Sequence, residues 1–211
     1  MTRAVIFDLN GVLLHGEHTR PELQRRWERA LVDNFGIDPD RFRDEFIFDI
    51  YIKKVIIGQT SLVEALDRRL PSLGYRGSTM AFAQFWLASD SEVNHELLAL
   101  VAQLKQRTDL RLFIATNQDH TSAQWLWQNL ALGELFEDMF YSARIGIRKP
   151  QRAFFDFVDS RIRPQSQPPL FFDDTPKVIA GARAAGWEAV QFDSFGDCAK
   201  HPWIAERLGQ P

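Results

Sequence analysis

The chain has 211 residues, of which 45% are hydrophobic and 25% are charged, and its formal net charge is −3. This composition is typical of a globular protein, and the mild acidity excludes the positive charge that nucleic-acid binding requires. No apolar run approaches the roughly 18 residues that span a membrane, and Cys198, the only cysteine, excludes an internal disulfide.

The first predicted element is a short buried strand over residues 4–7, where apolar and β-branched side chains follow one another. The following 16–90 segment has a different pattern, with four predicted helices and no convincing strand. These helices are predicted over residues 21–35, 40–57, 61–70 and 78–88. An all-helical block of this kind between a strand and an α/β region is best interpreted as an insertion.

The C-terminal half alternates strands with helices. Helices are predicted over 94–107, 121–132, 151–160 and 177–185, and strands over 111–115, 139–141, 170–172 and 188–192. This alternation indicates a parallel sheet covered on both faces. We therefore expect an α/β protein with a doubly wound, Rossmann-like core of residues 1–14 and 92–211, and an inserted helical cap of residues 15–91.

Polar residues follow three of the predicted strands, and a lysine precedes a predicted helix. In an open parallel sheet, ligands bind outside the carboxyl ends of the strands, so these side chains are expected to meet at one edge. They are Asp8, Thr116, Asn117, Lys149, Asp173 and Asp174.

Three clustered carboxylates cannot all stay ionised without a cation. Oxygen ligands with spare positions suit Mg²⁺, which usually binds one or two carboxylates, waters and a phosphate oxygen. Thr116 and Lys149 would hold the other oxygens of that phosphate, and Asp8 could attack phosphorus and form an aspartyl-phosphate. The site therefore predicts phosphoryl-transfer chemistry.

Each feature alone also has an ordinary structural interpretation. A strand-end Asp8 often caps a helix or forms a turn, and Lys149 before a proline is usually a solvated surface residue. Asp173 and Asp174 could cap the helix that follows them. The ordered combination favours the functional interpretation, because it is far less expected by chance than any of its members.

Four segments carry a resemblance to a known family: "FDLNGVLL", "IATN", "GIRKP" and "LFFDDTPKVIAGARAAGW". In this order they resemble the four motifs of the haloacid dehalogenase superfamily of hydrolases, and the helical insertion resembles the cap that follows the first motif. The last two motifs look most like the sugar-phosphatase branch, notably the α-glucose-1-phosphate phosphatase type.

The resemblance implies roles for individual residues. Asp8 matches the nucleophile, and Asp174, with Asp173 beside it, matches the acidic metal site. The main-chain carbonyl of Asn10 would complete the metal ligands. Thr116, Asn117, Lys149 and Gly11 are assigned to phosphate binding, with Thr116 and Lys149 also counted as catalytic.

The side chain of Asn10 departs from the family pattern. Most phosphatases of this superfamily have an aspartate there, which protonates the leaving oxygen and then activates water. An amide can do neither, and general acid–base catalysis is typically worth about 10²–10⁴ in rate. The sequence therefore predicts a weakened or leaving-group-selective enzyme, and Asn10 counts as a catalytic position.

Two alternatives remain beside a Mg²⁺-dependent hydrolase of a small, sugar-phosphate-like phosphomonoester. One is a 2-haloacid dehalogenase, against which the extra carboxylates Asp173 and Asp174 argue because they would repel an anionic haloacid. The other is a catalytically impaired binding or regulatory protein on the same scaffold, for which Asn10 is the best argument. The expected partner is a small phosphorylated molecule, with neither nucleic acid nor membrane. The protein is expected to be cytoplasmic, as a monomer or weak homodimer.

Overall fold

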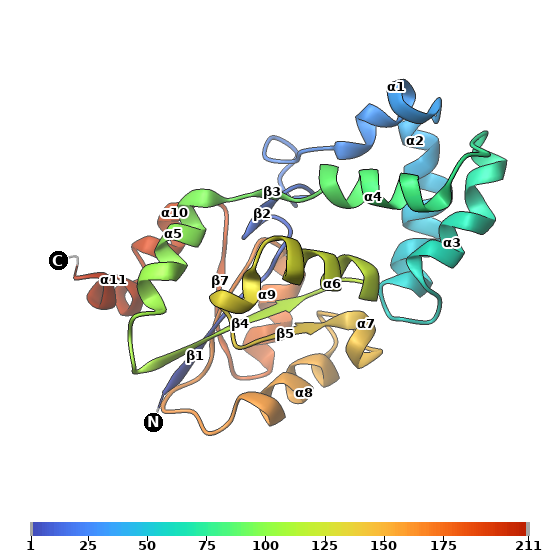
Figure 1. Cartoon of the computed structure of the whole chain (residues 1–211). Coiled ribbons are helices and arrows are strands. Elements are labelled where there is room, and N and C mark those ends of the chain that lie inside the picture. Colours follow the sequence, from blue (N-terminus) through green and yellow to red (C-terminus); the bar gives the residue numbers. More distant parts are fainter. Residues whose placement is uncertain (1, 210–211) are drawn as a thin grey trace.

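A five-stranded parallel sheet forms the centre of the computed structural model, which describes residues 2–209 (Figure 1). The strand order is β5-β4-β1-β6-β7, so the chain extends the sheet first to one side of β1 and then to the other. This order confirms the doubly wound α/β fold expected from the sequence. The strands are Arg3–Phe7 (β1), Leu110–Thr116 (β4), Asp138–Tyr141 (β5), Leu170–Asp173 (β6) and Glu188–Gln191 (β7).

The central strand β1 is buried on both faces. Its side chains alternate, so that Val5 and Phe7 belong to one apolar cluster while Ala4 and Ile6 belong to the other. A strand covered on both sides needs a continuous apolar run, which explains the sequence of β1. Phe7 pairs with Ile114 of β4 and with Phe172 of β6, so these three strands end together at one edge of the sheet.

Helices cover both faces of the sheet. One face packs against α5 (His95–Leu104), α6 (His120–Asn129), α10 (Phe195–Ala199) and α11 (Pro202–Leu208). The other packs against α8 (Arg152–Ile162) and α9 (Pro176–Ala184). Two shorter helices are η4 (Leu132–Glu134) and α7 (Ser142–Ile145). Within residues 2–209, the structure contains no helix with the length and apolar character that crossing a membrane requires.

A second group of helices lies beside the sheet and has an apolar cluster of its own (Figure 1). Phe42, Phe46, Phe82 and Trp86 form the centre of this cluster, and their rings pack at centroid distances of 5.2–6.0 Å. The helices are η1 (Trp27–Ala30), α1 (Leu31–Phe35), α2 (Pro39–Phe42), η2 (Arg43–Val55), α3 (Leu62–Arg69), η3 (Leu70–Leu73) and α4 (Thr79–Ser89). We call residues 27–89 the helical block.

Two very short strands connect the helical block to the sheet domain. Strand β2 (Leu14–His15) pairs antiparallel with β3 (Glu92–Val93), so the outgoing and returning passages of the chain lie side by side. The Nδ2 atom of Asn94 donates to the carbonyl of Val12 and reinforces this junction. Strands of two residues carry no periodic signal, which is why the sequence analysis found no strand there.

The sequence prediction was wrong in one segment of the helical block. Residues 21–35 were expected to form one helix, but residues 21–23 form a turn, residues 24–26 have no regular structure, and helix begins only at Trp27. This segment is polar, and its main chain bonds elsewhere: the N–H of Arg25 donates to the carbonyl of Gly16. The helix expected over 40–57 is divided into α2 and η2, and η2 is a π-helix, in which the N–H of Ile56 donates to the carbonyl of Tyr51.

Candidate active site

Three acidic side chains meet at the carboxyl edge of the sheet. Asp8 follows β1, Asp173 is the last residue of β6, and Asp174 comes directly after it. Each offers a carboxylate oxygen, and these three oxygens lie within 4.8 Å of one another. The structure therefore brings together the acidic residues that the sequence places at neighbouring strand ends, and Thr116 ends β4 at the same edge.

The carboxylate of Asp8 is fixed through one of its two oxygens. Its Oδ1 atom accepts a hydrogen bond from the N–H of Leu9 at 2.7 Å and lies 3.0 Å from Nζ of Lys149. Both contacts are made by the same oxygen, so the side chain is oriented. Among the described residues, no hydrogen bond or ion pair engages Oδ2. An oriented carboxylate with one uncommitted oxygen is suited to act as a nucleophile.

Lys149 is buried between the carboxylates. Its Nζ atom donates to Oδ2 of Asp173 at 2.6 Å and to the carbonyl of Ala115 at 2.8 Å. Burial opposes the charge, but Asp173 and Asp8 outweigh burial and raise the pKa of Lys149 above its usual value. The ammonium group is therefore charged at neutral pH and stands directly beside the candidate nucleophile.

Asn117 positions Lys149 through its main chain. The Oδ1 atom of Asn117 accepts from the N–H of Lys149 at 2.9 Å, and its Nδ2 atom donates to the Lys149 carbonyl at 3.1 Å. The sequence analysis assigned Asn117 to phosphate binding. In the structure its side chain is instead occupied by this reciprocal pair, so any direct contact with phosphate would come from its main chain.

The three carboxylates carry more negative charge than one lysine balances. Burial and the neighbouring Asp8 raise the pKa values of both Asp173 and Asp174. Both oxygens of Asp173 are engaged, by Lys149 and by the N–H of Thr175, and those of Asp174 accept from Thr19 and from the hydroxyl of Thr175. The excess charge and the all-oxygen donor set of Asp8, Asp173 and Asp174 fit a divalent cation such as Mg²⁺.

Gly11 lies against Asp174 rather than at the phosphate side of the site. Its φ angle is +80°, and a Cβ atom added there would lie 2.8 Å from Cγ of Asp174. Only glycine tolerates both this conformation and this close approach. On the other side, the N–H and the hydroxyl of Thr19 donate to Oδ2 of Asp174 at 2.8 and 3.0 Å.

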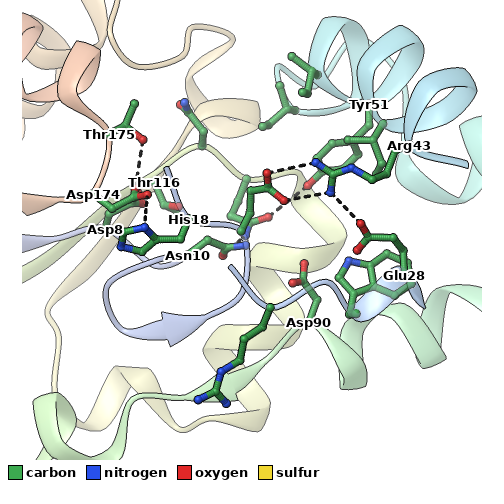
Figure 2. Close-up of a pocket in the computed structure, with 18 of the residues that line it drawn as sticks. Asp8, Asn10, His18, Glu28, Arg43, Tyr51, Asp90, Thr116, Asp174 and Thr175 are labelled. Atoms are coloured by element: carbon green, nitrogen blue, oxygen red, sulfur yellow. Dashed lines mark hydrogen bonds and ion pairs between the residues drawn. The ribbon is translucent and has the colours of Figure 1, made fainter. Parts of the chain in front are cut away.

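A cavity of about 330 Å³ opens over these groups, with the helical block on its far side (Figure 2). Asp8, Asn10, Thr116 and Asp174 line its floor. From the helical block, η2 presents Arg43, Ile47, Phe48, Tyr51 and Ile52, and Trp27, Glu28, Ile56 and Trp86 also line that wall. Because the sheet edge and the helical block, whose apolar clusters are separate, line one cavity, a substrate there could contact both.

The charged groups on the far wall are mostly paired with one another. Arg43 donates to the buried Glu28 at 2.8 Å (Figure 2) and to Glu17 at 3.1 Å. Arg26 also donates to Glu28. Hydrogen bonds to Glu17 and Glu28 raise the pKa of Arg43 despite burial, so it remains charged. These residues therefore give the cavity a fixed polar wall.

The amide of Asn10 is held by a neighbour. Its Oδ1 atom accepts from Nε2 of Gln118 at 3.1 Å, and Oε1 of Gln118 accepts from the hydroxyl of Tyr51 at 3.3 Å. This chain of contacts joins the first motif to the helical block. The sequence analysis did not single out Gln118, although it directly follows the polar pair at the end of β4.

Several other cavity residues were also missed by the sequence analysis. Among those with polar side chains are Glu17, Glu28, Arg43, Tyr51 and Asp90. None follows a predicted core strand, and no local pattern distinguishes them from surface residues of a helical segment. Their positions could be recognised only from long-range contacts.

Comparisons with known proteins point to one family. A family model described as haloacid dehalogenase-like hydrolase matches residues 2–186. Over 207 residues the chain is 27% identical to Phosphatase MT3486 of Mycobacterium tuberculosis, covering 92% of this chain and 88% of that protein.

Solved structures show the same fold. The HAD family enzyme bt-2542 from Bacteroides thetaiotaomicron, in its magnesium complex, superposes with a TM-score of 0.72 at 18% identity, covering 90% of this chain and 93% of that chain. A HAD-like family hydrolase from Porphyromonas gingivalis gives a TM-score of 0.72 at 22% identity and covers 100% of both chains.

Proposed function

The chain belongs to the haloacid dehalogenase-like hydrolases, and on this premise we propose that it is a Mg²⁺-dependent phosphatase of a small phosphomonoester. The observation that carries the proposal is the contact between Asp8 and Lys149 beside two further carboxylates. Phosphatase MT3486, the relative at 27% identity, supports phosphoryl transfer over other hydrolytic reactions.

In the proposed reaction, Oδ2 of Asp8 attacks phosphorus and forms an aspartyl-phosphate. The bond from phosphorus to the ester oxygen breaks, and its electron pair stays on the departing oxygen. Thr116 and Lys149 hold the phosphoryl oxygens, and Lys149 offsets the charge that builds up on them. Water then attacks the phosphorus of the intermediate, releases inorganic phosphate and restores the Asp8 carboxylate.

The proposed metal site lies among the three carboxylates. Asp8, Asp174 and the main-chain carbonyl of Asn10 would hold Mg²⁺, and Asp173 would remain beside it to position Lys149. When bound, Mg²⁺ supplies positive charge that offsets the charge of the phosphate oxygens. Magnesium in the bt-2542 complex supports this proposal.

The negative charge of the site disfavours dehalogenase activity on an anionic haloacid. A haloacid carries its own carboxylate, which the cluster of Asp8, Asp173 and Asp174 would repel. The buried Lys149 is already shared between Asp8 and Asp173, so it offers little compensation to a second anion. A phosphate bound together with a divalent cation avoids this conflict.

We further propose that residues 15–91 act as a cap that selects the substrate. The cavity wall combines the apolar Ile47 and Phe48 with the paired Arg43 and Glu28. A small substrate with both apolar and hydroxyl-bearing surfaces fits such a wall, which is consistent with a sugar-phosphate-like ester. Closure of the cap would also exclude water.

The experiment is a phosphatase screen of wild type and Asp8→Asn with and without Mg²⁺. Asp33→Asn, which changes an exposed aspartate of α1, is the matched control. We expect Mg²⁺-dependent release of phosphate by wild type and by the control, and none by Asp8→Asn. Turnover that survives in Asp8→Asn would show that the nucleophile has been misplaced.

A further inference from the structure

Hydrolysis by the proposed route needs a proton at two points. The departing ester oxygen must gain one, and the attacking water must lose one. Asn10 occupies the position from which the family usually supplies both, but an amide neither donates nor accepts a proton at neutral pH. Its Oδ1 atom is moreover occupied by Gln118. Another group in the cavity has to provide this proton transfer.

Most titratable groups that line the cavity are committed to other partners. Asp8 and Asp174 belong to the carboxylate cluster, and Glu17 and Glu28 are paired with Arg43. His18 lies on the Asp174 side of the cavity, 3.9 Å from Oδ2 of that residue, and its Nδ1 atom accepts from the main chain of Arg20. The carboxylates among these side chains are therefore paired or belong to the proposed metal site, and His18 contacts the proposed metal ligand Asp174.

Asp90 differs from them because it lacks a basic partner. Its Oδ2 atom accepts a hydrogen bond from Nε1 of Trp86 at 3.3 Å. Within residues 2–209, no lysine, arginine or histidine forms an ion pair with it. The carboxyl group is partly buried and lines the cavity, so Oδ1 remains available to a bound molecule.

The position of Asp90 places this carboxyl beside Asn10. A Cβ atom added to Gly16 would lie 3.2 Å from Oδ1 of Asp90 and 3.9 Å from Nδ2 of Asn10, so the two side chains flank the same point. No hydrogen bond joins them. Figure 2 shows both side chains at the opening between the acidic floor and the Arg43 wall.

The direction of attack makes this side of the cavity relevant. Asp8 approaches phosphorus from the floor, and in an in-line displacement the departing oxygen leaves on the opposite side. That side faces the helical block and the junction with the sheet domain. Asp90 lies at this junction, between the end of α4 and the start of β3.

Resting on the phosphatase function proposed above, we propose that Asp90 replaces the missing acid–base group of position 10. In the first step, its carboxyl gives a proton to the ester oxygen as the bond from that oxygen to phosphorus breaks. In the second step, the resulting carboxylate takes a proton from the water that attacks the aspartyl-phosphate. Asp90 thus ends the cycle protonated, as it began.

The surroundings of Asp90 suit a group that changes protonation near neutral pH. Burial, together with the nearby Glu28 and Glu17, raises the pKa of Asp90 to about 7, although the hydrogen bond from Trp86 acts in the opposite direction. The cation facing it from η2 is Arg43, whose charge is offset by those same glutamates. Arg25 also lines the cavity and is paired with Glu92.

The test compares Asp90→Asn with wild type on two esters, 4-nitrophenyl phosphate and glycerol phosphate. The nitrophenolate leaves without a proton, whereas the alkoxide of glycerol requires one. We expect kcat/KM for glycerol phosphate to fall about 100-fold, and that for 4-nitrophenyl phosphate to fall much less. For glycerol phosphate, the decline of wild-type kcat/KM above about pH 7 should disappear in Asp90→Asn.

Two further variants separate proton transfer from a structural effect. Asp33→Asn removes an exposed carboxylate that does not line the cavity, and we expect it to leave the ratio between the two esters unchanged. The double variant Asn10→Asp with Asp90→Asn should recover glycerol phosphate turnover, because it returns a carboxyl to position 10. Such recovery would also show that the loss in Asp90→Asn was not a failure to fold.

The outcomes distinguish this inference from the function on which it rests. If wild type hydrolyses neither ester, the proposed function fails and the role of Asp90 fails with it. If wild type is active and Asp90→Asn affects both esters equally or not at all, only the assignment of Asp90 is overturned. A gain of about 100-fold in Asn10→Asp alone would likewise overturn it, because Asp90 would then not be supplying the proton.

Discussion

The Nζ atom of Lys149 lies 3.0 Å from Oδ1 of Asp8, and both groups are buried at the carboxyl edge of the sheet. The same ammonium donates to Asp173 at 2.6 Å, so one positive charge holds two carboxylates together. This arrangement links stability to catalysis, because the groups that react are also groups whose burial must be compensated.

Removing the lysine should therefore affect both properties. In Lys149→Met, two buried carboxylates lose their cation, and we expect the free energy of unfolding to fall by about 3 kcal/mol. Phosphatase activity should fall severely, because the transferring group loses its ammonium partner. Urea unfolding and steady-state kinetics would measure the two effects. Lys105→Met, at an exposed position, is the control and should change neither.

Magnesium binding should depend on Asp174. We expect calorimetric titration to show Mg²⁺ binding to wild type and to Asp33→Asn, but strongly weakened binding to Asp174→Asn. Burial and Asp8 raise the pKa of Asp174, so protons compete with the metal, and the affinity should decrease as the pH falls. Equal affinities in all three proteins would exclude Asp174 as a ligand.

Gly11 and Gly36 offer a matched pair of glycine substitutions. Both have positive φ angles, but a Cβ atom at Gly11 would collide with Asp174, whereas one at Gly36 would meet nothing within 4 Å. We expect Gly36→Ala to cost about 1 kcal/mol of stability for its backbone conformation. Gly11→Ala should cost more and should also weaken Mg²⁺ binding, since Asp174 must move. If Gly11→Ala and Gly36→Ala lose similar amounts of stability and the Mg²⁺ affinity of Gly11→Ala is unchanged, the packing argument is contradicted.

The raised pKa of Asp90 predicts a pH dependence of stability that needs no activity measurement. The carboxyl keeps its proton in the folded chain up to about pH 7, whereas in the unfolded chain it loses that proton near pH 4. Between these values the folded state binds more protons, so this group makes wild type less stable as the pH rises. Asp90→Asn lacks this effect.

Chemical unfolding of the two proteins at a series of pH values would check this prediction. The difference in unfolding free energy should move in favour of Asp90→Asn from pH 5 to pH 8. Asp33→Asn is the control, because it removes an exposed carboxylate that does not line the cavity. A difference that stays constant with pH would mean that Asp90 titrates normally.

The sequence was sufficient to predict the sheet and the floor of the site, because both depend on local patterns. The run that forms β1 is continuously apolar, and Asp8 interrupts it at the point where the strand ends. Parallel strands share one carboxyl edge, so Asp8, Thr116 and Asp174 could be expected together before any coordinates were known. The order of the four motifs along the chain supported the resemblance to the haloacid dehalogenase superfamily.

The far wall of the cavity could not be predicted in the same way. Arg43, Tyr51 and Asp90 come from helices or their ends, where charged and aromatic residues are ordinary. Their meeting with Asn10 depends on how the helical block packs over the sheet edge, and no local pattern carries that information. The non-helical residues 21–26 were mistaken for helix for a related reason, since their bonds are made to other parts of the chain.

The central claim is that Asp8 carries the phosphoryl group during turnover. Its most direct test is to mix the protein with Mg²⁺ and 4-nitrophenyl phosphate, quench with acid within one turnover, and search the peptides by mass spectrometry. We predict a phosphorylated peptide with the modification on Asp8, and none in Asp8→Asn. Phosphate release by wild type with Asp8 unmodified at every quench time, or with the phosphoryl group on another residue, would contradict the mechanism.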